Sequence, residues 1–110
     1  MTTAVEDVSL EDVKRGLADG SIVLIDVREP NEFEIVSIDG AILIPKGQFI
    51  DGSALEQLPS DRRVVLHCKV GGRSAEALAV VKGAGYADAI HVGGGILAWV
   101  AQIEPDKPSY

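Results

Sequence analysis

The stretch Val64 to Ala84, VVLHCKVGGRSAEALAVVKGA, decides the fold and contains Cys68, the only cysteine in the chain. Its first three residues are apolar and rich in valine, which predicts a short buried strand. From Ser74 onward Ala, Glu, Leu and Val dominate, which predicts a helix of about three turns. Cys68 therefore stands in a glycine-containing loop between the carboxyl end of a strand and the amino end of a helix.

This position favours a reactive thiolate. The first N–H groups of a helix have no partner within the helix, and the helix dipole adds positive potential there. Lys69 and Arg73 place two cations close to the thiol, which lowers the pKa of a cysteine. Gly71 and Gly72 let the loop turn its amide groups inward as an anion-binding nest. A lone cysteine is more often a small buried apolar residue, but these features together predict chemistry at Cys68.

Composition excludes several classes of protein. The chain has 110 residues and a net charge of −7, so a nucleic-acid or anionic-membrane surface is not expected. No apolar run approaches the roughly 20 residues needed to span a bilayer, and the N-terminal sequence lacks the regions of a signal peptide. A single cysteine cannot form an internal disulfide, which suits a reducing compartment. We therefore expect a cytoplasmic protein without membrane or nucleic-acid partners.

The length predicts one domain over 1–110, with a core at about 9–103 and an extended tail at 104–110. The apolar runs predict strands at 22–27, 41–44, 64–66 and 89–92. The remaining periodic segments predict helices at 10–18, 31–35, 54–58, 74–83 and 96–103. This alternation indicates an α/β domain with a mainly parallel central sheet and helices on both faces.

Other residues with chemical potential lie at the predicted strand ends. Asp26, Arg28 and Glu29 follow the first strand, at the edge where α/β sheets bind ligands, although Arg28 and Glu29 are equally explained by ion pairs that fix the turn. The triplet 93–95, Gly-Gly-Gly, is either a second anion nest or a place of close backbone approach beside the cysteine loop. The four cations Arg62, Arg63, Lys69 and Arg73 are expected to bracket Cys68.

A metal site is not expected. His67 and Cys68 are neighbours in an extended segment, so their side chains should point to opposite sides. With His91 as the only other histidine, a zinc site built on Cys68 lacks ligands.

Three blocks of sequence resemble a single-domain rhodanese, a sulfurtransferase, over residues 9–103. The first is Leu24-Ile25-Asp26-Val27-Arg28-Glu29-Pro30 with Glu32-Phe33, followed by Ile38-Asp39-Gly40-Ala41 and Ile44-Pro45. The second is the active loop Cys68-Lys69-Val70-Gly71-Gly72-Arg73-Ser74, and the third is Gly94-Gly95-Ile96 with Trp99. The chain departs from the family at Ser37, where a histidine is frequent. The Cys-Lys-x-Gly loop and the Pro-rich tail ending in Tyr110 are most similar to the C-terminal rhodanese domain of E1-like adenylyltransferases.

The resemblance implies a rhodanese-like fold and a mechanism without cofactor or metal. Cys68 would be the catalytic nucleophile, taking sulfane sulfur from a small anionic donor such as thiosulfate into a persulfide. Lys69 would attract the donor, and Arg73 would contact it or brace the carbonyl groups of the loop. The implied partner is a sulfur-carrier protein with a Gly-Gly tail, as in molybdopterin, thiamine or cysteine synthesis. The residues implied to bind the persulfide are Lys69, Val70, Gly71, Gly72 and Arg73, with Asp26, Arg28 and Ser74 in support.

Two other functions remain open. His67-Cys68 and Arg73-Ser74 mimic the signature of cysteine-dependent phosphatases and arsenate reductases, whose loops usually hold one more residue between Cys and Arg. The second alternative is a non-catalytic rhodanese-like binding module, although such modules commonly lack the cysteine.

Overall fold

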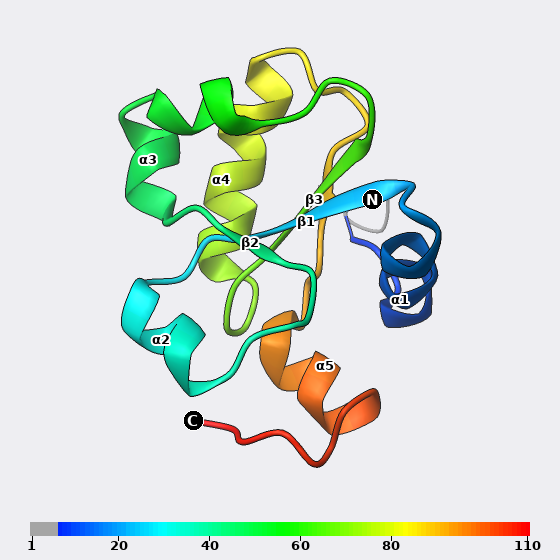
Figure 1. Ribbon diagram of the computed structural model, residues 1–110. Helices are drawn as coiled ribbons and strands as arrows, with labels where there is room; N and C mark the ends of the chain where they lie inside the picture. The colour runs from blue at the N-terminus through cyan, green and yellow to red at the C-terminus, as the bar shows by residue number, and fades with distance from the viewer. Residues whose placement is uncertain (1–6) are drawn as a thin grey trace.

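The computed structural model describes residues 7–110, and a four-stranded sheet forms its centre (Figure 1). The strands lie in the order β2-β1-β3-β4, and each neighbouring pair is parallel. The two central strands pair over five residues, from Ile22 opposite Arg63 to Asp26 opposite His67. The expected parallel sheet is confirmed. The strands are β1 (Ile22–Asp26), β2 (Ile42–Leu43), β3 (Arg63–His67) and β4 (Ile90–His91).

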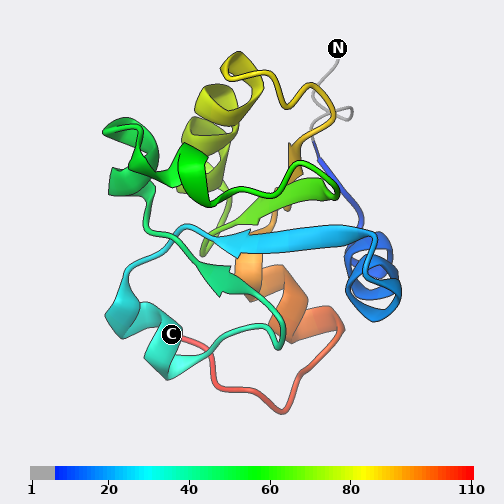
Figure 2. The same cartoon turned by 45° about the horizontal axis from the view of Figure 1, so that its top comes forward.

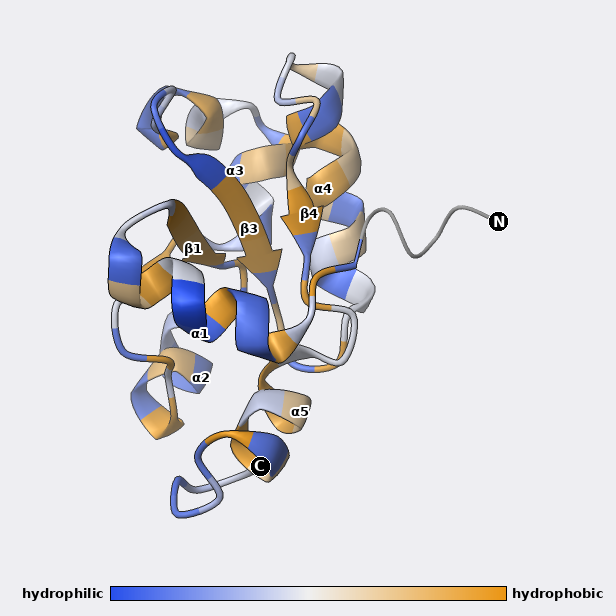
Figure 3. Ribbon diagram, turned by 90° about the vertical axis from the view of Figure 1, so that its right-hand side faces the viewer, coloured by the Kyte–Doolittle hydropathy of each residue, from blue (hydrophilic) through white to orange (hydrophobic). Residues whose placement is uncertain are grey.

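Helices cover both faces of this sheet, as the sequence predicts (Figures 1 and 2). Alternate residues of a strand point to opposite faces, so Val23 and Ile25 of β1 join one core cluster and Leu24 joins the other. The first cluster is covered by α3 (Lys46–Ile50), the 3-10 helix η2 (Ser53–Gln57) and α4 (Gly72–Gly83), and the second by α1 (Leu10–Asp19) and α5 (Gly95–Gln102). Figure 3 shows the central strands in the colour of apolar residues, whereas α1 alternates apolar and polar segments.

Local signals set the ends of two helices. Ser9 caps α1, because its hydroxyl accepts a hydrogen bond from the Asp12 amide at 3.1 Å, and Gly20 ends this helix with a φ of +76°. The short helix α2 (Pro30–Ile35) begins with proline and is closed by a reciprocal capping box between Glu29 and Glu32. None of the helices described over 7–110 is long and apolar enough to cross a membrane.

The structure corrects several predicted boundaries. Helix α3 is missing from the prediction, because only Phe49 of its five residues is buried and no apolar period marks it. The helix expected at 54–58 is the 3-10 helix η2. The helix after the cysteine loop begins at Gly72 rather than Ser74. The outer strands β2 and β4 are only two residues long: β2 pairs with β1, and β4 with β3, over two positions each, and His91 adds an isolated bridge to Asp7.

Candidate active site

Cys68 lies at the carboxyl edge of the sheet. It directly follows β3, and four residues later α4 begins at Gly72. Because β1 and β3 are parallel and Asp26 lies opposite His67, both strands deliver their following residues to the same edge. The Cys68 side chain is buried, with 1% of its surface exposed.

Backbone amides surround the thiol. The amide of Gly71 donates a hydrogen bond to Cys68 Sγ at 3.1 Å, and the amide of Ser74 donates a longer one at 3.4 Å. Gly71 has a φ of +113°, and a Cβ at this position would overlap the carbonyl oxygen of Gly93. Only glycine therefore allows the loop to fold its amides back onto the sulfur.

These hydrogen bonds decide the acidity of the thiol. Burial of Cys68 raises the pKa of its thiol, but hydrogen bonds from the Ser74 hydroxyl and from the amides of Ser74, Gly71 and Val70 outweigh burial, so that the pKa is lowered. The lowered pKa agrees with the sequence-based expectation, but its main cause does not. The loop hydrogen bonds contribute more than Lys69 and Arg73 do.

The hydroxyl of Ser74 connects the thiol to a histidine. It lies 3.6 Å from Cys68 Sγ, 3.1 Å from the carbonyl oxygen of Gly71 and 2.8 Å from Nδ1 of His91. His91 reaches this position because β4 pairs with β3, which places it beside Leu66. When Nδ1 carries the proton, it donates to Ser74. The single serine proton then goes to the carbonyl oxygen of Gly71 or, once Cys68 is ionised, to the thiolate. From the sequence, His91 was weighed only as a zinc ligand, and its contact with Ser74 was not predicted.

Arg73 is held by an acidic residue of α2. Its guanidinium donates to both carboxylate oxygens of Glu32, at 2.6 and 3.0 Å. This bidentate pair, with burial opposing it, lowers the pKa of Glu32 to about 2 and raises the pKa of Arg73. Arg73 therefore braces the start of α4 against α2, through a carboxylate rather than through the carbonyl groups of the loop that the sequence suggested. From the sequence, Glu32 was only part of a family motif and had no predicted role.

The supporting residues Asp26 and Arg28 form a buried ion pair. Arg28 is fully buried and donates from Nε and Nη2 to Asp26 at 2.9 and 2.7 Å, and from Nη2 to the carbonyl oxygen of Val36 at 2.7 Å. Its partner is therefore Asp26, whereas Glu29 caps α2. His67 Nε2 lies 3.6 Å from the same Asp26 carboxylate, and burial lowers the pKa of His67. These residues fix the turn after β1 rather than facing the thiol.

The glycine triplet packs directly against the cysteine loop. The amide of Ile96 donates to the carbonyl oxygen of Cys68 at 2.8 Å, and the amide of Leu97 donates to that of Lys69 at 3.2 Å. A Cβ on Gly95 would overlap the same two carbonyl groups. The first amides of α5 are thus occupied by the loop, which confirms close approach rather than a second anion nest.

The segment 104–110 returns to the site through Tyr110. The Tyr110 hydroxyl donates to Glu32 Oε2 and accepts from Arg28 Nη1, both at 2.7 Å. Burial is the largest influence on the pKa of Tyr110 and raises it. Arg28 lowers this pKa and Glu32 raises it, and because the net effect is a raised pKa, the phenol keeps its proton. The ammonium of Lys69 lies over its ring, 4.4 Å from the centroid. From the sequence, Tyr110 was only the last residue of a tail similar to that of adenylyltransferase rhodanese domains, and no contact was predicted for it.

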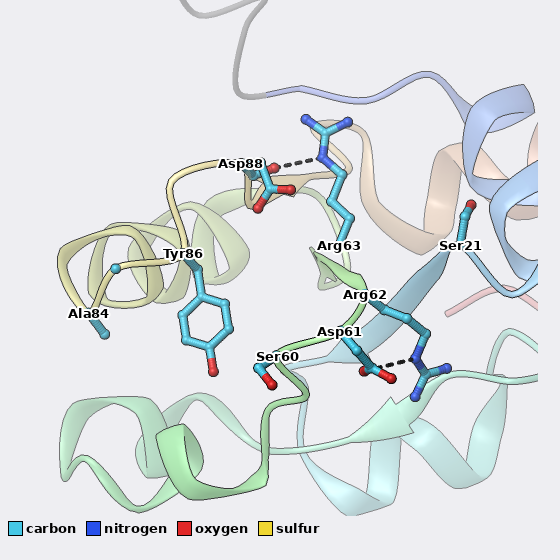
Figure 4. Close-up of a pocket in the computed structure, with 9 residues that line it drawn as sticks. Ser21, Ser60, Asp61, Arg62, Arg63, Ala84, Tyr86 and Asp88 are labelled. Carbon is cyan, nitrogen blue, oxygen red and sulfur yellow. Dashed lines mark hydrogen bonds and ion pairs between the residues drawn. The ribbon is translucent and has the colours of Figure 1, made fainter.

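Arg62 and Arg63 lie far from Cys68, so the expectation that they bracket it is wrong. Arg63 opens β3 and Cys68 follows its end, a separation of roughly 16 Å along an extended strand. Both arginines line a polar cavity of about 610 Å³ at the opposite edge of the sheet, where Arg63 donates to the carbonyl oxygen of Asp88 at 2.6 Å (Figure 4).

Comparison with known families agrees with this geometry. The profile of the rhodanese-like domain matches residues 9–102. The chain belongs to the rhodanese-like domain family. This rhodanese domain is 57% identical over 89 residues to a probable adenylyltransferase/sulfurtransferase, MoeZ, of Mycobacterium tuberculosis, which confirms the resemblance to rhodanese domains of adenylyltransferases. The match covers 81% of this chain but only 23% of MoeZ.

Two further relatives span more of this rhodanese domain. It is 32% identical to the thiosulfate:glutathione sulfurtransferase of Saccharomyces cerevisiae, with 88% of this chain and 79% of the yeast protein covered. The structure of reduced Bacillus anthracis CoADR-RHD superposes with a TM-score of 0.82 at 32% identity, covering 96% of this chain and 18% of that one. The rhodanese fold is therefore confirmed.

The serine hydroxyl provides a direct test of the cradle around Cys68. Replacing Ser74 by alanine removes the hydroxyl and leaves the amides in place, so the pKa of the thiol should rise. The rate of Cys68 alkylation, followed from pH 5 to 10, measures this shift. Ser60→Ala, which lies in the distant polar cavity, serves as the control. An unchanged midpoint in Ser74→Ala would show that the hydroxyl does not stabilise the thiolate.

Proposed function

We propose that this rhodanese domain transfers sulfane sulfur through a persulfide on Cys68. The observation that carries the proposal is the surrounding of its sulfur: the amides of Gly71 and Ser74 donate to it, and the Ser74 hydroxyl lies 3.6 Å away. Donors that converge on a sulfur favour its anionic form, which is the nucleophile. The same donors would favour an anionic outer sulfur bound to Cys68, helped by the dipole at the start of α4.

Two displacements complete the reaction. The Cys68 thiolate attacks the outer sulfur of thiosulfate, a new S–S bond forms, and sulfite leaves with the electron pair of the broken S–S bond. The thiolate of an acceptor, or cyanide, then attacks the outer sulfur of the Cys68 persulfide, and Cys68 leaves as thiolate. Neither step needs a metal or a cofactor. Lys69 would attract the dianionic donor, and the Arg73–Glu32 pair would hold the loop.

A sulfur-carrier protein with a flexible Gly-Gly tail is our proposed acceptor. Support comes from the similarity to MoeZ, whose name joins adenylyltransferase and sulfurtransferase activities. Val70, at the tip of the loop, is 61% exposed and offers an apolar contact beside Lys69. The carboxyl end of the tail would approach Cys68 along this side.

The phosphatase alternative is less compatible with the loop. A phosphatase arginine must point its donors at the oxygens of the phosphoryl group, whereas both ends of the Arg73 guanidinium are occupied by Glu32. Only four residues separate Cys68 from Arg73, which makes a small nest. A non-catalytic binding module would not need the donors that surround Cys68.

Intact-protein mass spectrometry tests the proposed reaction. Incubation with thiosulfate should add the mass of one sulfur atom, and cyanide or a reducing thiol should remove it. Cys68→Ser should gain nothing, because a hydroxyl is a far weaker nucleophile at neutral pH. Hydrolysis of an aryl phosphate, measured in parallel, should be negligible. Phosphatase activity without any sulfur adduct would overturn the proposal in favour of its alternative.

NMR titration tests the proposed acceptor. Adding a small carrier protein that ends in Gly-Gly should shift the amide signals of Lys69, Val70 and Gly93–Gly95. A carrier without the two glycines should shift them less, since the tail is the part that enters the site. Shifts confined to Ser60 and Tyr86, at the opposite edge of the sheet, would contradict this mode of binding.

A further inference from the structure

Charge is distributed unevenly around the cysteine loop. Two carboxylates of the surrounding network are neutralised, Asp26 by Arg28 and Glu32 by Arg73. Lys69 differs from these cations. Over residues 7–110 no carboxylate forms an ion pair with its ammonium, which lies instead over the ring of Tyr110. An aromatic ring attracts an ammonium without cancelling its charge.

Tyr110 is fixed from both sides. Its hydroxyl is shared between Arg28, which is fully buried, and Glu32, which is held by Arg73. The phenol therefore has one position relative to the cysteine loop, and its ring offers one face to Lys69.

The rest of the segment 104–110 is also anchored. Glu104 accepts a hydrogen bond from the indole of Trp99 at 2.6 Å, and the ammonium of Lys107 donates to the carbonyl oxygen of Ser37 at 2.7 Å. These contacts direct the segment back across the carboxyl edge of the sheet, where Figure 2 shows it ending near α2. Tyr110 reaches Lys69 because of them.

We infer that Tyr110 is a positioning residue that determines donor specificity, by holding Lys69 beside Cys68 with its positive charge intact. The hydroxyl of Tyr110 also keeps Glu32 turned toward Arg73, so that the acidic chain presents one local cation to an incoming sulfur donor. This inference rests on the proposed sulfur transfer and names the charge class of its substrate, a dianion such as thiosulfate. A fixed cation next to the nucleophile favours a dianion over a singly charged donor.

Steady-state kinetics of three variants test the inference, with cyanide as acceptor. Tyr110→Leu should raise the KM for thiosulfate on the order of five-fold and leave kcat within about two-fold, because the cation acts on binding. Tyr110→Phe keeps the aromatic ring but loses the hydrogen bonds to Arg28 and Glu32, so it should raise KM by less than Tyr110→Leu does. With an aromatic thiosulfonate, which carries one negative charge, the effect of Tyr110→Leu should be smaller. Tyr86→Leu removes a tyrosine at the distant cavity and should leave KM unchanged.

The Lys69→Met variant shows whether Tyr110 acts through Lys69. This change alone should raise the KM for thiosulfate by at least as much as Tyr110→Leu. Combining the two should add nothing further, since residues that act as a unit are not additive. An unchanged KM in Tyr110→Leu would overturn the inference, and so would an equal rise from Tyr110→Leu in the Lys69→Met background.

Anion binding separates this inference from the proposed function. Sulfite, titrated into Cys68→Ser and followed by NMR, should bind more weakly after Tyr110→Leu is added to that variant. This measurement does not require turnover. If the native protein forms no persulfide but Tyr110→Leu still weakens sulfite binding in the Cys68→Ser background, sulfur transfer is refuted and the role of Tyr110 stands. If the native protein forms the persulfide but Tyr110→Leu leaves sulfite binding unchanged, sulfur transfer stands and the role of Tyr110 is refuted.

Discussion

The hydrogen bonds from the loop amides to the sulfur of Cys68 are the interaction on which the site depends. A buried thiol resists ionisation, and in this protein only converging donors reverse that tendency. The donors belong to the backbone, so their direction is set by the path of the loop. The rest of the fold fixes that path. Strand β3 delivers Cys68, helix α4 begins at Gly72, and α5 donates to the carbonyl groups of Cys68 and Lys69 from the other side.

Ionic contacts act one step further out. Arg73 braces the loop against Glu32, and Arg28 joins Asp26, Val36 and Tyr110 beneath it. Buried charges are tolerated only when they are paired and hydrogen-bonded. Arg28 has several partners, and Arg73 donates twice to Glu32. The site therefore uses its cations as structural elements, with Lys69 as the exception. This arrangement leaves one cation without an ion pair beside Cys68, within residues 7–110 of a chain whose net charge is −7.

The parts of the fold that were predictable are those coded by neighbours in sequence. The parallel sheet, the position of Cys68 after a strand and the capped start of α1 all follow from local patterns. The short helix α3 was not predictable, because a single buried residue, Phe49, leaves no periodic signal. The two arginines of 62–63 were misplaced because nearness in sequence was taken as nearness in space, whereas an extended strand separates them from the cysteine.

The site residues that could not be predicted from the sequence share one property: each lies far along the chain from the residue that it contacts. His91 is 17 residues from Ser74, Glu32 is 41 residues from Arg73, and Tyr110 is 78 residues from Glu32. Each contact exists only after the strands have paired and the final segment has folded back. A single sequence contains no local signal for such contacts, although Glu32 and Tyr110 both stood within motifs that carried the family resemblance.

The ionisation of Cys68 itself tests the central claim, that backbone and serine hydrogen bonds make this buried thiol acidic. Because Cys68 is the only cysteine, ¹³C-labelled cysteine gives a single Cβ signal whose chemical shift reports its protonation. We predict a native midpoint clearly below the value in urea, which should lie near the free-thiol pKa of about 8.5. The native midpoint should stay low at high salt, because buried hydrogen bonds are screened far less than exposed charges. A native midpoint at or above the one in urea would contradict the account.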